Sequence, residues 1–401
     1  MTHEPPPPIS WPLARDAAHA AGLAHPRGQV EVPLAEADGL TLAAPLVPLV
    51  DLPPFPTSSV DGWAVRGDGP WKIVGRVLAG DRAEPLRGDG TCVEIATGAM
   101  VPAGTRTIIR LEHATVRDEL VSGVPRDRKE WRQPGEEAAR GELLCPAGTP
   151  VDPGVIGLAA ACGHDTLPVW PAMPTAILIF GNELRVVGPP VDGRIRDALG
   201  PCLPAWARRL GARPIPGFAP MGPGADTLAA HIDAVRAAID AGAQLIVTTG
   251  GTMRGPVDHV RATLAELGAR YVVDTVAVRP GYPMILAELG SGRFLAALPG
   301  NPHSAVIALM SLVAPLLAGA AGRPLPALST LRLAEDVVGM PDNTRLVLVD
   351  RDGQPGRHTG SAMLRGLATA TGFAVVPPGE TIRAGAEASV LPLPLLHWER
   401  P

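Results

Sequence analysis

Two patterns of apolar and polar positions divide this chain near residue 174. Between residues 57 and 128, short apolar runs alternate with Gly and Asp turns, which is typical of β-rich structure. Downstream of residue 174, short apolar strands alternate with amphipathic helices, in which residues such as Leu228, Ile232 and Val235 recur at helical spacing. The downstream pattern predicts a doubly wound α/β unit with helices on both faces of its sheet.

The predicted elements of the α/β unit follow one another closely. They comprise strands at 175–180, 244–249, 271–278, 283–289 and 293–298 and helices at 196–210, 225–241, 256–267 and 302–319. Outside this unit, helices are predicted at 10–23 and 153–162, the second ended by Gly163. Residues 325–401 return to short strands. The predicted fold class is therefore multidomain, with a central α/β domain and further β-rich domains.

Composition narrows the class of protein. A chain of 401 residues is expected to form several domains, and 46% hydrophobic residues suffice for buried cores. The net charge of −5 and the pI of about 6.1 give no basic footprint for nucleic acid. The four cysteines are widely spaced and form no CxxC pair, so we expect reduced thiols rather than a zinc site or a disulfide framework.

The N-terminus and the longest apolar stretch bear on localisation. The first ten residues lack a basic region followed by an apolar run, so no secretion signal is expected. Residues 305–322 are free of charge but rich in Ala and Gly and contain Pro315, and we interpret them as a buried core helix. The sequence therefore predicts a cytoplasmic protein that binds no membrane and no nucleic acid.

Two turns after predicted strands have the composition of anion sites. In residues 298–304, Asn301 can cap the following helix, Pro302 suits its first turn, and Gly300 permits close approach to the backbone. Residues 248–258 form a second glycine-containing turn after the strand at 244–249. Free N–H groups at such turns bind anions. Two of them in one unit suggest a ligand with a phosphate at one end and an oxyanion at the other.

Seven motifs in a fixed order resemble those of a known family. They are DLPPFPTSSVDGWAV at 51–65, EIATGAMVP at 94–102, GEE at 135–137, GNEL at 181–184, TGG at 249–251, PGYP at 280–283 and LPGNP at 298–302. Together they span essentially the whole chain. The chain resembles a divergent member of the MoeA family, the molybdopterin molybdenumtransferases, which are related to the carboxyl-terminal domain of gephyrin.

The resemblance implies a four-domain subunit. Residues 1–50 and 129–172 would form a discontinuous domain I for linkage and dimerisation, and residues 51–128 a β-rich domain II. Residues 173–324 would form domain III, the α/β molybdopterin-binding domain, and residues 325–401 domain IV, a small β-barrel. The subunit is expected to form a homodimer, and expected protein partners are the molybdopterin adenylyltransferase and client molybdoenzymes.

The activity that the resemblance implies is insertion of molybdate into adenylylated molybdopterin, with release of AMP and a requirement for Mg2+. This chemistry needs positive potential for the oxyanion, carboxylates for a hard cation, and glycine turns for the phosphates. Carried over from the family, the catalytic residues would be Asp61, Thr97, Glu183 and Asp258. The three acids among them would be metal ligands.

Each of these assignments has a structural alternative. Asp61 beside Gly62 can form an Asx-turn, and Thr97 with Gly98 can form a tight turn. Glu183 can be a surface charge. Asp258, expected in the first turn of a helix, can merely complement the helix dipole.

The remaining site residues bind ligand in the family. The resemblance assigns cofactor binding to Gly250, Gly251, Arg279, Pro283, Pro299, Gly300, Asn301, Pro302, Ser304, Arg345 and Ser361. Ser304 can instead simply occupy the first turn of its helix.

The sequence also departs from the family at several pocket positions. Where the family usually has Lys at two positions, this chain has Arg279 and Tyr282. Arg279 keeps the positive charge but carries it on a planar guanidinium, and Tyr282 has no charge. Other departures are Met253 for Ser, Pro256 for an acid, Asn182 for Asp, Glu137 for Asp and Leu199 for Asn. We expect Arg254 to supply the charge missing at Tyr282.

The residues leave some other functions open and disfavour others. The departures leave open a paralogue that binds molybdopterin or its nucleotide as carrier or assembly partner without turnover, and also a scaffolding role. A nicotinamide-dependent enzyme is disfavoured because no GxGxxG follows the strand at 175–180. A hydrolase using His303 or Ser304 lacks a recognisable base and orienting group. The choice between molybdate and tungstate stays open.

Overall fold

The computed structural model describes residues 7–218, 226–253, 255, 258–358 and 360–395. The chain divides into two compact units. Unit 1 comprises Met1–Val30, Gly39–Ala43 and Val169–Pro401, and unit 2 comprises Glu31–Asp38 and Ala44–Pro168. The finer division into four domains stays a prediction.

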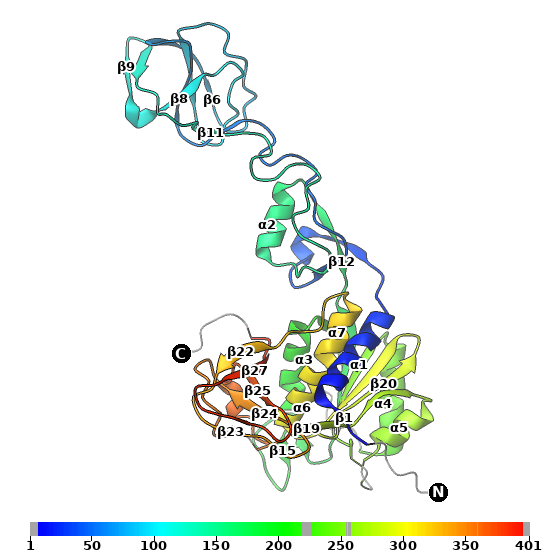
Figure 1. Ribbon diagram of the computed structural model, residues 1–401. Coiled ribbons are helices and arrows are strands. Elements are labelled where there is room, and N and C mark those ends of the chain that lie inside the picture. The colour runs from blue at the N-terminus through cyan, green and yellow to red at the C-terminus, as the bar shows by residue number, and fades with distance from the viewer. Residues whose placement is uncertain (1–6, 219–225, 254, 256–257, 359, 396–401) are drawn as a thin grey trace. The chain divides into compact units, whose positions relative to one another are not determined.

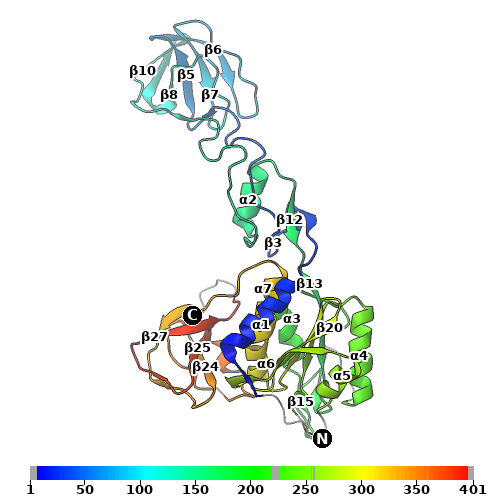
Figure 2. The ribbon, with the colours of Figure 1, turned by 45° about the vertical axis from the view of Figure 1, so that its right-hand side comes forward.

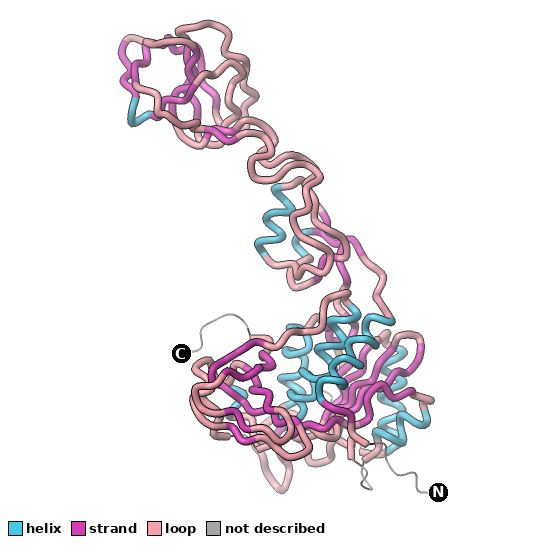
Figure 3. Tube along the Cα trace, in the orientation of Figure 1, coloured by secondary structure: helices cyan, strands magenta, loops and turns pink. Residues whose placement is uncertain are grey.

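Unit 2 is β-rich, as the spacing of its turns predicted. Figure 3 shows strands and loops over most of it, with one regular helix, α2 (Pro153–Ala161). The Asp152 side chain caps α2 by accepting the N–H of Val155, and Gly163, at φ 93°, follows its end. The remaining elements are η1 (Leu34–Glu36), β4 (Thr57–Ser58), β5 (Gly62–Arg66), β6 (Trp71–Val77), β7 (Thr91–Ile95), β8 (Thr107–Arg110), η2 (Leu111–His113), β9 (Ala114–Arg117), β10 (Leu120–Gly123) and β11 (Trp131–Arg132).

The main sheet of unit 2 has the strand order β8-β5-β7-β6-β10-β9. Alternate residues of β5 bury on opposite faces: Trp63 and Val65 join one apolar cluster, and Ala64 joins the other. This period of two is what a strand with both faces covered requires. Three further short strands are β2 (Val30–Pro33) and β12 (Thr166–Trp170), which span the boundary between the units, and β3 (Thr41–Leu42).

Unit 1 contains the α/β sheet, with strand order β16-β13-β17-β21-β20-β18. β13, β16, β17 and β21 pair in parallel, whereas β20 runs antiparallel to both of its neighbours, β21 and β18. The bounds are β13 (Met173–Ile179), β16 (Ala212–Pro214), β17 (Leu245–Thr249), β18 (Arg270–Asp274), β20 (Ile285–Gly290) and β21 (Arg293–Leu298). The predicted α/β class is confirmed.

Helices cover both faces of this sheet. Figures 1 and 2 show α1 (Trp11–Ala24) and α7 (Ala314–Ala320) side by side on one face and α4 (Leu228–Asp240) and α5 (Val260–Glu266) on the other. Ile177 and Val247 point into the first cluster, and Leu178 and Ile246 point into the second. The sheet is therefore the middle layer of a three-layer unit.

Residues 302–320 form one continuous helix that consists of α6 (Pro302–Ala308), a π-helical segment, η3 (Leu309–Val313), and α7. Within the described residues this is the one helix long and apolar enough to cross a membrane by length and composition. Every residue of its most apolar window is buried. The expectation of a buried core helix is confirmed, and Trp11 of α1 donates its indole N–H to Ser311 within this core.

Three predicted helices begin three or more residues later than their apolar pattern suggested, and among them α4 starts at Leu228 rather than at residue 225. α3 (Leu199–Arg209) starts after Arg196, because Ile195–Arg196 (β15) pairs with Leu184–Arg185 (β14). α5 was expected from residue 256 but begins at Val260. The carboxylate of Asp258 accepts the N–H groups of Met253 and Gly255, which holds the chain in a turn before the helix. The placement of Asp258 in a first helical turn was therefore wrong.

The C-terminal strands form a further sheet, with order β1-β19-β24-β25-β27-β22. It joins C-terminal strands to β19 from the α/β region, with Arg279 opposite Arg345 in the parallel pair β19–β24. The bounds of its strands are β1 (Ile9–Ser10), β19 (Val276–Arg279), β22 (Ser329–Arg332), β24 (Thr344–Val349), β25 (Gly372–Val376) and β27 (Glu387–Pro392). A separate two-stranded sheet pairs β23 (Val337–Val338) with β26 (Thr381–Ile382), and η4 (Gly366–Ala368) is a short 3-10 helix.

The crossing of α1 and α7 gives a stability prediction. A Cβ on Gly319 would overlap the carbonyl oxygen of His19, and one on Gly22 would overlap that of Leu316. Gly319→Ala forces the helices apart, so we expect the free energy of unfolding to fall by about 2 kcal/mol. Denaturant unfolding measures it.

Gly157 provides the matched control. It lies on the exposed side of α2, and a Cβ there meets no atom within 4 Å. Gly157→Ala should therefore stabilise the protein by roughly 0.5–1 kcal/mol, since Ala has the higher helix propensity. Equal effects of the two substitutions would contradict the tight crossing.

Candidate functional site

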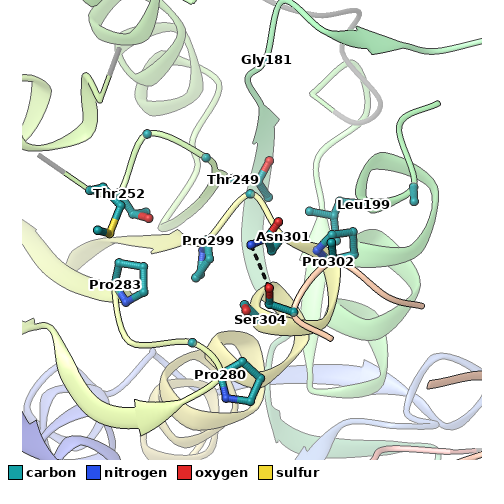
Figure 4. Close-up of a pocket in the computed structure, with 18 of the residues that line it drawn as sticks. Gly181, Leu199, Thr249, Thr252, Pro280, Pro283, Pro299, Asn301, Pro302 and Ser304 are labelled. Atoms are coloured by element: carbon teal, nitrogen blue, oxygen red, sulfur yellow. Dashed lines mark hydrogen bonds between the residues drawn. The ribbon is translucent and has the colours of Figure 1, made fainter. Parts of the chain in front are cut away.

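A cavity of about 980 Å³ lies at the carboxyl ends of the parallel strands of unit 1. Figure 4 shows the turns that follow β13, β17 and β21 around it, at Gly181, Thr249 and Pro299. Ligands bind at this edge of open α/β sheets because strand ends and loop backbones converge there. The structure thus brings the two predicted anion turns to one cavity.

The two glycine turns contact each other. Gly250 donates its N–H to the carbonyl oxygen of Leu298 at 3.0 Å, and a Cβ on Gly300 would lie 3.5 Å from the Cα of Gly250. Gly250 and Gly251 have φ angles of 84° and 62°, which favour glycine. A ligand that contacts one turn is therefore within reach of the backbone of the other.

Asn301 does not cap the helix that follows it. It occupies the N-cap position of α6, but its side chain makes no capping hydrogen bond and its Nδ2 instead donates to Ser361 Oγ at 3.2 Å, the dashed line in Figure 4. The backbone N–H of His303 donates to the carbonyl oxygen of Ser361. Asn301 therefore ties the strand-to-helix turn to the C-terminal region, and the expected cap is wrong.

Four carboxylates line the cavity. Glu183 and Asp258 were predicted from the sequence, whereas Asp197 and Asp226 were missed. Asp197 is 4% exposed, and its Oδ1 accepts the N–H groups of Leu199 and Gly200 at the start of α3. Among the described residues its buried Oδ2 has no hydrogen-bond partner. An unpaired buried carboxylate oxygen is costly, so this atom is a candidate ligand for a donor or a cation.

Asp226 could have been suspected from its position. It precedes Thr227, whose side chain caps α4, and an acid beside a helix start is a common local feature. Nothing in the local sequence shows that this helix start faces the cavity. Asp226 also accepts from His231 Nε2, 3.0 Å away, and the ring of His231 stacks on Phe180 at 3.6 Å between centroids.

The cationic side of the cavity carries Arg279 and Arg345. Because these residues are opposite each other in a parallel strand pair, their side chains leave the same face of the sheet. Pro283, Pro299, Pro302 and Ser304 also line the cavity, and Ser304 is 4% exposed. All the residues predicted to bind cofactor line it, so the structure brings them together, although their roles stay predictions.

The departures give the cavity an apolar side. Leu199 is buried in its wall, and Met253, 56% exposed, lies at its edge. Figure 4 shows Leu199 near Pro302. Arg254 and Pro256 lie outside the described residues, so the expectation that Arg254 replaces a missing charge stays a prediction.

Asp61 and Thr97 lie in unit 2, away in sequence from the other predicted catalytic residues. Both are exposed, and Asp61 Oδ1 accepts the backbone N–H of Thr97 at 2.8 Å. This hydrogen bond joins the two residues in one local structure. Their catalytic role stays a prediction.

No group of three or more His, Cys, Asp or Glu side chains within the described ranges could by itself hold a metal ion. Mg2+ usually binds one or two carboxylates and completes its shell with water and substrate phosphates. The oxygen donors of this cavity, with the unpaired Oδ2 of Asp197 among them, fit that mode of binding.

Three family models match the chain in order. They are the MoeA N-terminal region (domain I and II) at residues 11–163, a probable molybdopterin binding domain at 176–319, and the MoeA C-terminal region (domain IV) at 330–393. Together they cover both units. This combination of an α/β ligand-binding domain with flanking MoeA regions defines the class.

Named relatives agree. The molybdopterin molybdenumtransferase of Synechococcus elongatus is 30% identical over 374 residues, which cover 88% of this chain and 91% of the relative. Molybdopterin molybdenumtransferase 2 of Mycobacterium tuberculosis is 33% identical over 322 residues, covering 74% and 76% of the two chains. This chain belongs to the MoeA family of molybdopterin molybdenumtransferases.

A solved structure supports the fold over the whole length. The molybdopterin biosynthesis MoeA protein of Pyrococcus horikoshii aligns with a TM-score of 0.77 and 25% identity, covering 97% of this chain and all of that one. A second structure of a MoeA protein from this organism aligns with a TM-score of 0.75 at 19% identity. The predicted fold class and family resemblance are confirmed.

The buried His231 gives a prediction about pH. Burial lowers the pKa of His231 from its usual 6.5, and this outweighs the opposite effect of Asp226. Below pH 6.5 the unfolded chain therefore binds a proton at this histidine that the folded protein does not bind. The free energy of unfolding consequently decreases as the pH is lowered below 6.5. His231→Phe removes this contribution and should flatten the decline.

Chemical denaturation at pH 7.5, 6.5 and 5.5 measures the effect. The free energy of unfolding of the wild type should decline with pH more steeply than that of His231→Phe, while the Phe ring can still stack on Phe180. His113→Phe, at an exposed histidine of unit 2, controls for loss of an imidazole. Parallel curves for wild type and His231→Phe would contradict the assignment.

Proposed function

We propose that this protein is a molybdopterin molybdenumtransferase, which inserts molybdate into adenylylated molybdopterin and releases AMP. The observation that carries the proposal is the cavity in which two glycine turns, three arginines and four carboxylates meet. The names of the relatives supply the substrate, and the cavity supplies groups for its phosphates and for an oxyanion. We also propose a cytoplasmic location.

The residues divide by chemistry. The backbone N–H groups of Gly251 and Gly300 would hold the phosphates, because exposed amides at strand-to-helix turns favour anions, whereas the N–H of Gly250 is donated to Leu298 and joins the two turns. Arg279, Arg345 and Ser361 would hold molybdate and present it to the dithiolene sulfurs. The phosphates and the oxyanion would thereby be held close together, which lowers the entropic cost of the transfer.

Carboxylates would complete the site. Glu183 and Asp258 would share a divalent cation with the phosphates, and in a homodimer Asp61 and Thr97 of a second copy would contribute to the same site. A bound cation would neutralise charge on the pyrophosphate as its bond breaks and AMP leaves. Glu183 and Asp258 would orient the water molecules around it. The adenylyltransferase and the client enzymes are proposed as partners on the same basis.

Release of AMP tests the proposal. Purified protein is incubated with adenylylated molybdopterin, molybdate and Mg2+, and AMP is quantified by chromatography. AMP should appear only when molybdate is present. Retention of the intact nucleotide without AMP would contradict the transferase and indicate a carrier, and failure to bind the nucleotide would contradict both.

Glu183→Gln should lower the rate of AMP release by roughly 10- to 100-fold, because the amide keeps the shape but loses the charge. Glu183 is exposed, so its substitution should leave the Tm unchanged. Asp233→Asn, on the exposed side of α4 and outside the cavity, is the matched control and should keep wild-type turnover. Equal rates for the two variants would remove Glu183 from the mechanism.

Removal of divalent cations should stop turnover. Protein and substrates treated with EDTA should release no AMP, and Mg2+ added in excess should restore the rate. The fold should persist, since Tm in the presence of EDTA is expected to match that of untreated protein. Unchanged AMP release in EDTA would contradict the cation requirement.

A further inference from the structure

Arg279 and Tyr282 form a contact within the cavity wall. The guanidinium carbon of Arg279 lies 4.8 Å from the centroid of the Tyr282 ring, within the range of cation–π attraction. Both residues line the cavity, and Tyr282 is half-buried while Arg279 is exposed. The aromatic ring therefore supports a cation that faces the ligand space.

The backbone fixes this pair. Arg279 is the last residue of β19, and the chain turns back so that the carbonyl oxygen of Tyr282 accepts the N–H of Val276 at 3.2 Å. Gly281, in the middle of the turn, has φ 111°, and a Cβ there would come within 3.1 Å of Ile307 Cγ2. Figure 4 shows the turn between Pro280 and Pro283 at the cavity. The ring of Tyr282 is thus anchored to the strand that carries Arg279.

A second guanidinium lies on the neighbouring strand. Arg345 is the register partner of Arg279, and its Nη1 donates to the carbonyl oxygen of Val338 at 2.5 Å. Within the described part of the chain, no carboxylate forms an ion pair with Arg279 or Arg345. Adjacent strands lie about 4.8 Å apart, a spacing that lets both side chains contact one small anion.

Stacking leaves the donors of Arg279 available. The five N–H groups of a guanidinium lie in its plane, so a ring against one face leaves the edges free. A fixed fork loses less conformational entropy on binding an anion than a mobile one. A lysine ammonium can also lie over a ring, but it has no planar fork of donors that stacking would fix in one orientation.

We propose that Tyr282 is a positioning residue, which holds Arg279 as a planar fork beside Arg345 and thereby determines the affinity of the cavity for a tetrahedral oxyanion. The inference rests on the proposed function and deepens it. It assigns the ring, rather than a second positive charge, as the support for oxyanion binding at this position. The nucleotide, held by the glycine turns, should be insensitive to Tyr282.

Calorimetric titration with molybdate tests the inference. The variants are Tyr282→Leu, which removes the ring, Tyr282→Phe, which keeps it, and each of these combined with Arg279→Ala. Tyr282→Leu should raise the Kd for molybdate roughly 3- to 30-fold, the range expected for loss of a cation–π contact. Tyr282→Phe should rescue binding to within about twofold of wild type, since the ring face remains.

Two further readouts separate positioning from a loss of structure. In the Arg279→Ala background, Tyr282→Leu should cause no additional loss of molybdate affinity, because the group that the ring holds is absent. In turnover assays, Tyr282→Leu should raise KM for molybdate and leave the Kd for adenylylated molybdopterin unchanged. A merely destabilised cavity would weaken both ligands.

The outcomes distinguish this inference from the proposed function. Wild-type protein that binds no molybdate and releases no AMP overturns both. Wild-type binding with equal affinity in Tyr282→Leu overturns the positioning role alone and leaves the function intact. A loss in Tyr282→Phe as large as in Tyr282→Leu also overturns it, because the hydroxyl rather than the ring would then be required.

Discussion

The position of the ligand cavity depends on two parallel strands that end side by side. β17 and β21 are paired in register up to Thr249 and Leu298, so the turns that follow them start at the same level of the sheet. Gly250 and Gly300 then let the two backbones approach within van der Waals contact. A larger residue at Gly250 would strain the backbone, because its φ of 84° favours glycine, whereas a Cβ on Gly300 would lie at ordinary contact distance from the Cα of Gly250.

Charge is distributed around these turns in a consistent way. Carboxylates come from the loops after β13, from the turn before α5 and from the start of α4, whereas Arg279 and Arg345 come from the pair β19–β24 and Arg196 comes from β15. Phosphates held at the turns would therefore have cation ligands on one side and guanidinium groups on the other. An oxyanion binds to guanidinium groups, whereas a pyrophosphate also binds a divalent cation that carboxylates can hold. The cavity has both kinds of group.

Local sequence predicted those features that local interactions determine. The strand, the glycine turn and the helix around residues 298–302 were readable because each follows from the residues present. The partner of Asn301 was not readable, since Ser361 lies sixty positions away and belongs to the C-terminal region. The predicted start of α5 was wrong because the spacing of apolar residues contains no information about the hydrogen bonds that the Asp258 side chain accepts. A tertiary contact decided the first case, and local hydrogen bonds from a side chain to backbone three and five positions away decided the second.

The amides of the two turns offer the most direct test of this account. In a perdeuterated sample, the backbone N–H resonances of Gly250, Gly251 and Gly300 are assigned and followed while adenylylated molybdopterin is added. The account predicts that these three resonances shift together with one saturation curve, while that of Gly157 on α2 stays in place. If the nucleotide binds and the three glycine resonances do not move, the turns are not the phosphate site and the account is wrong.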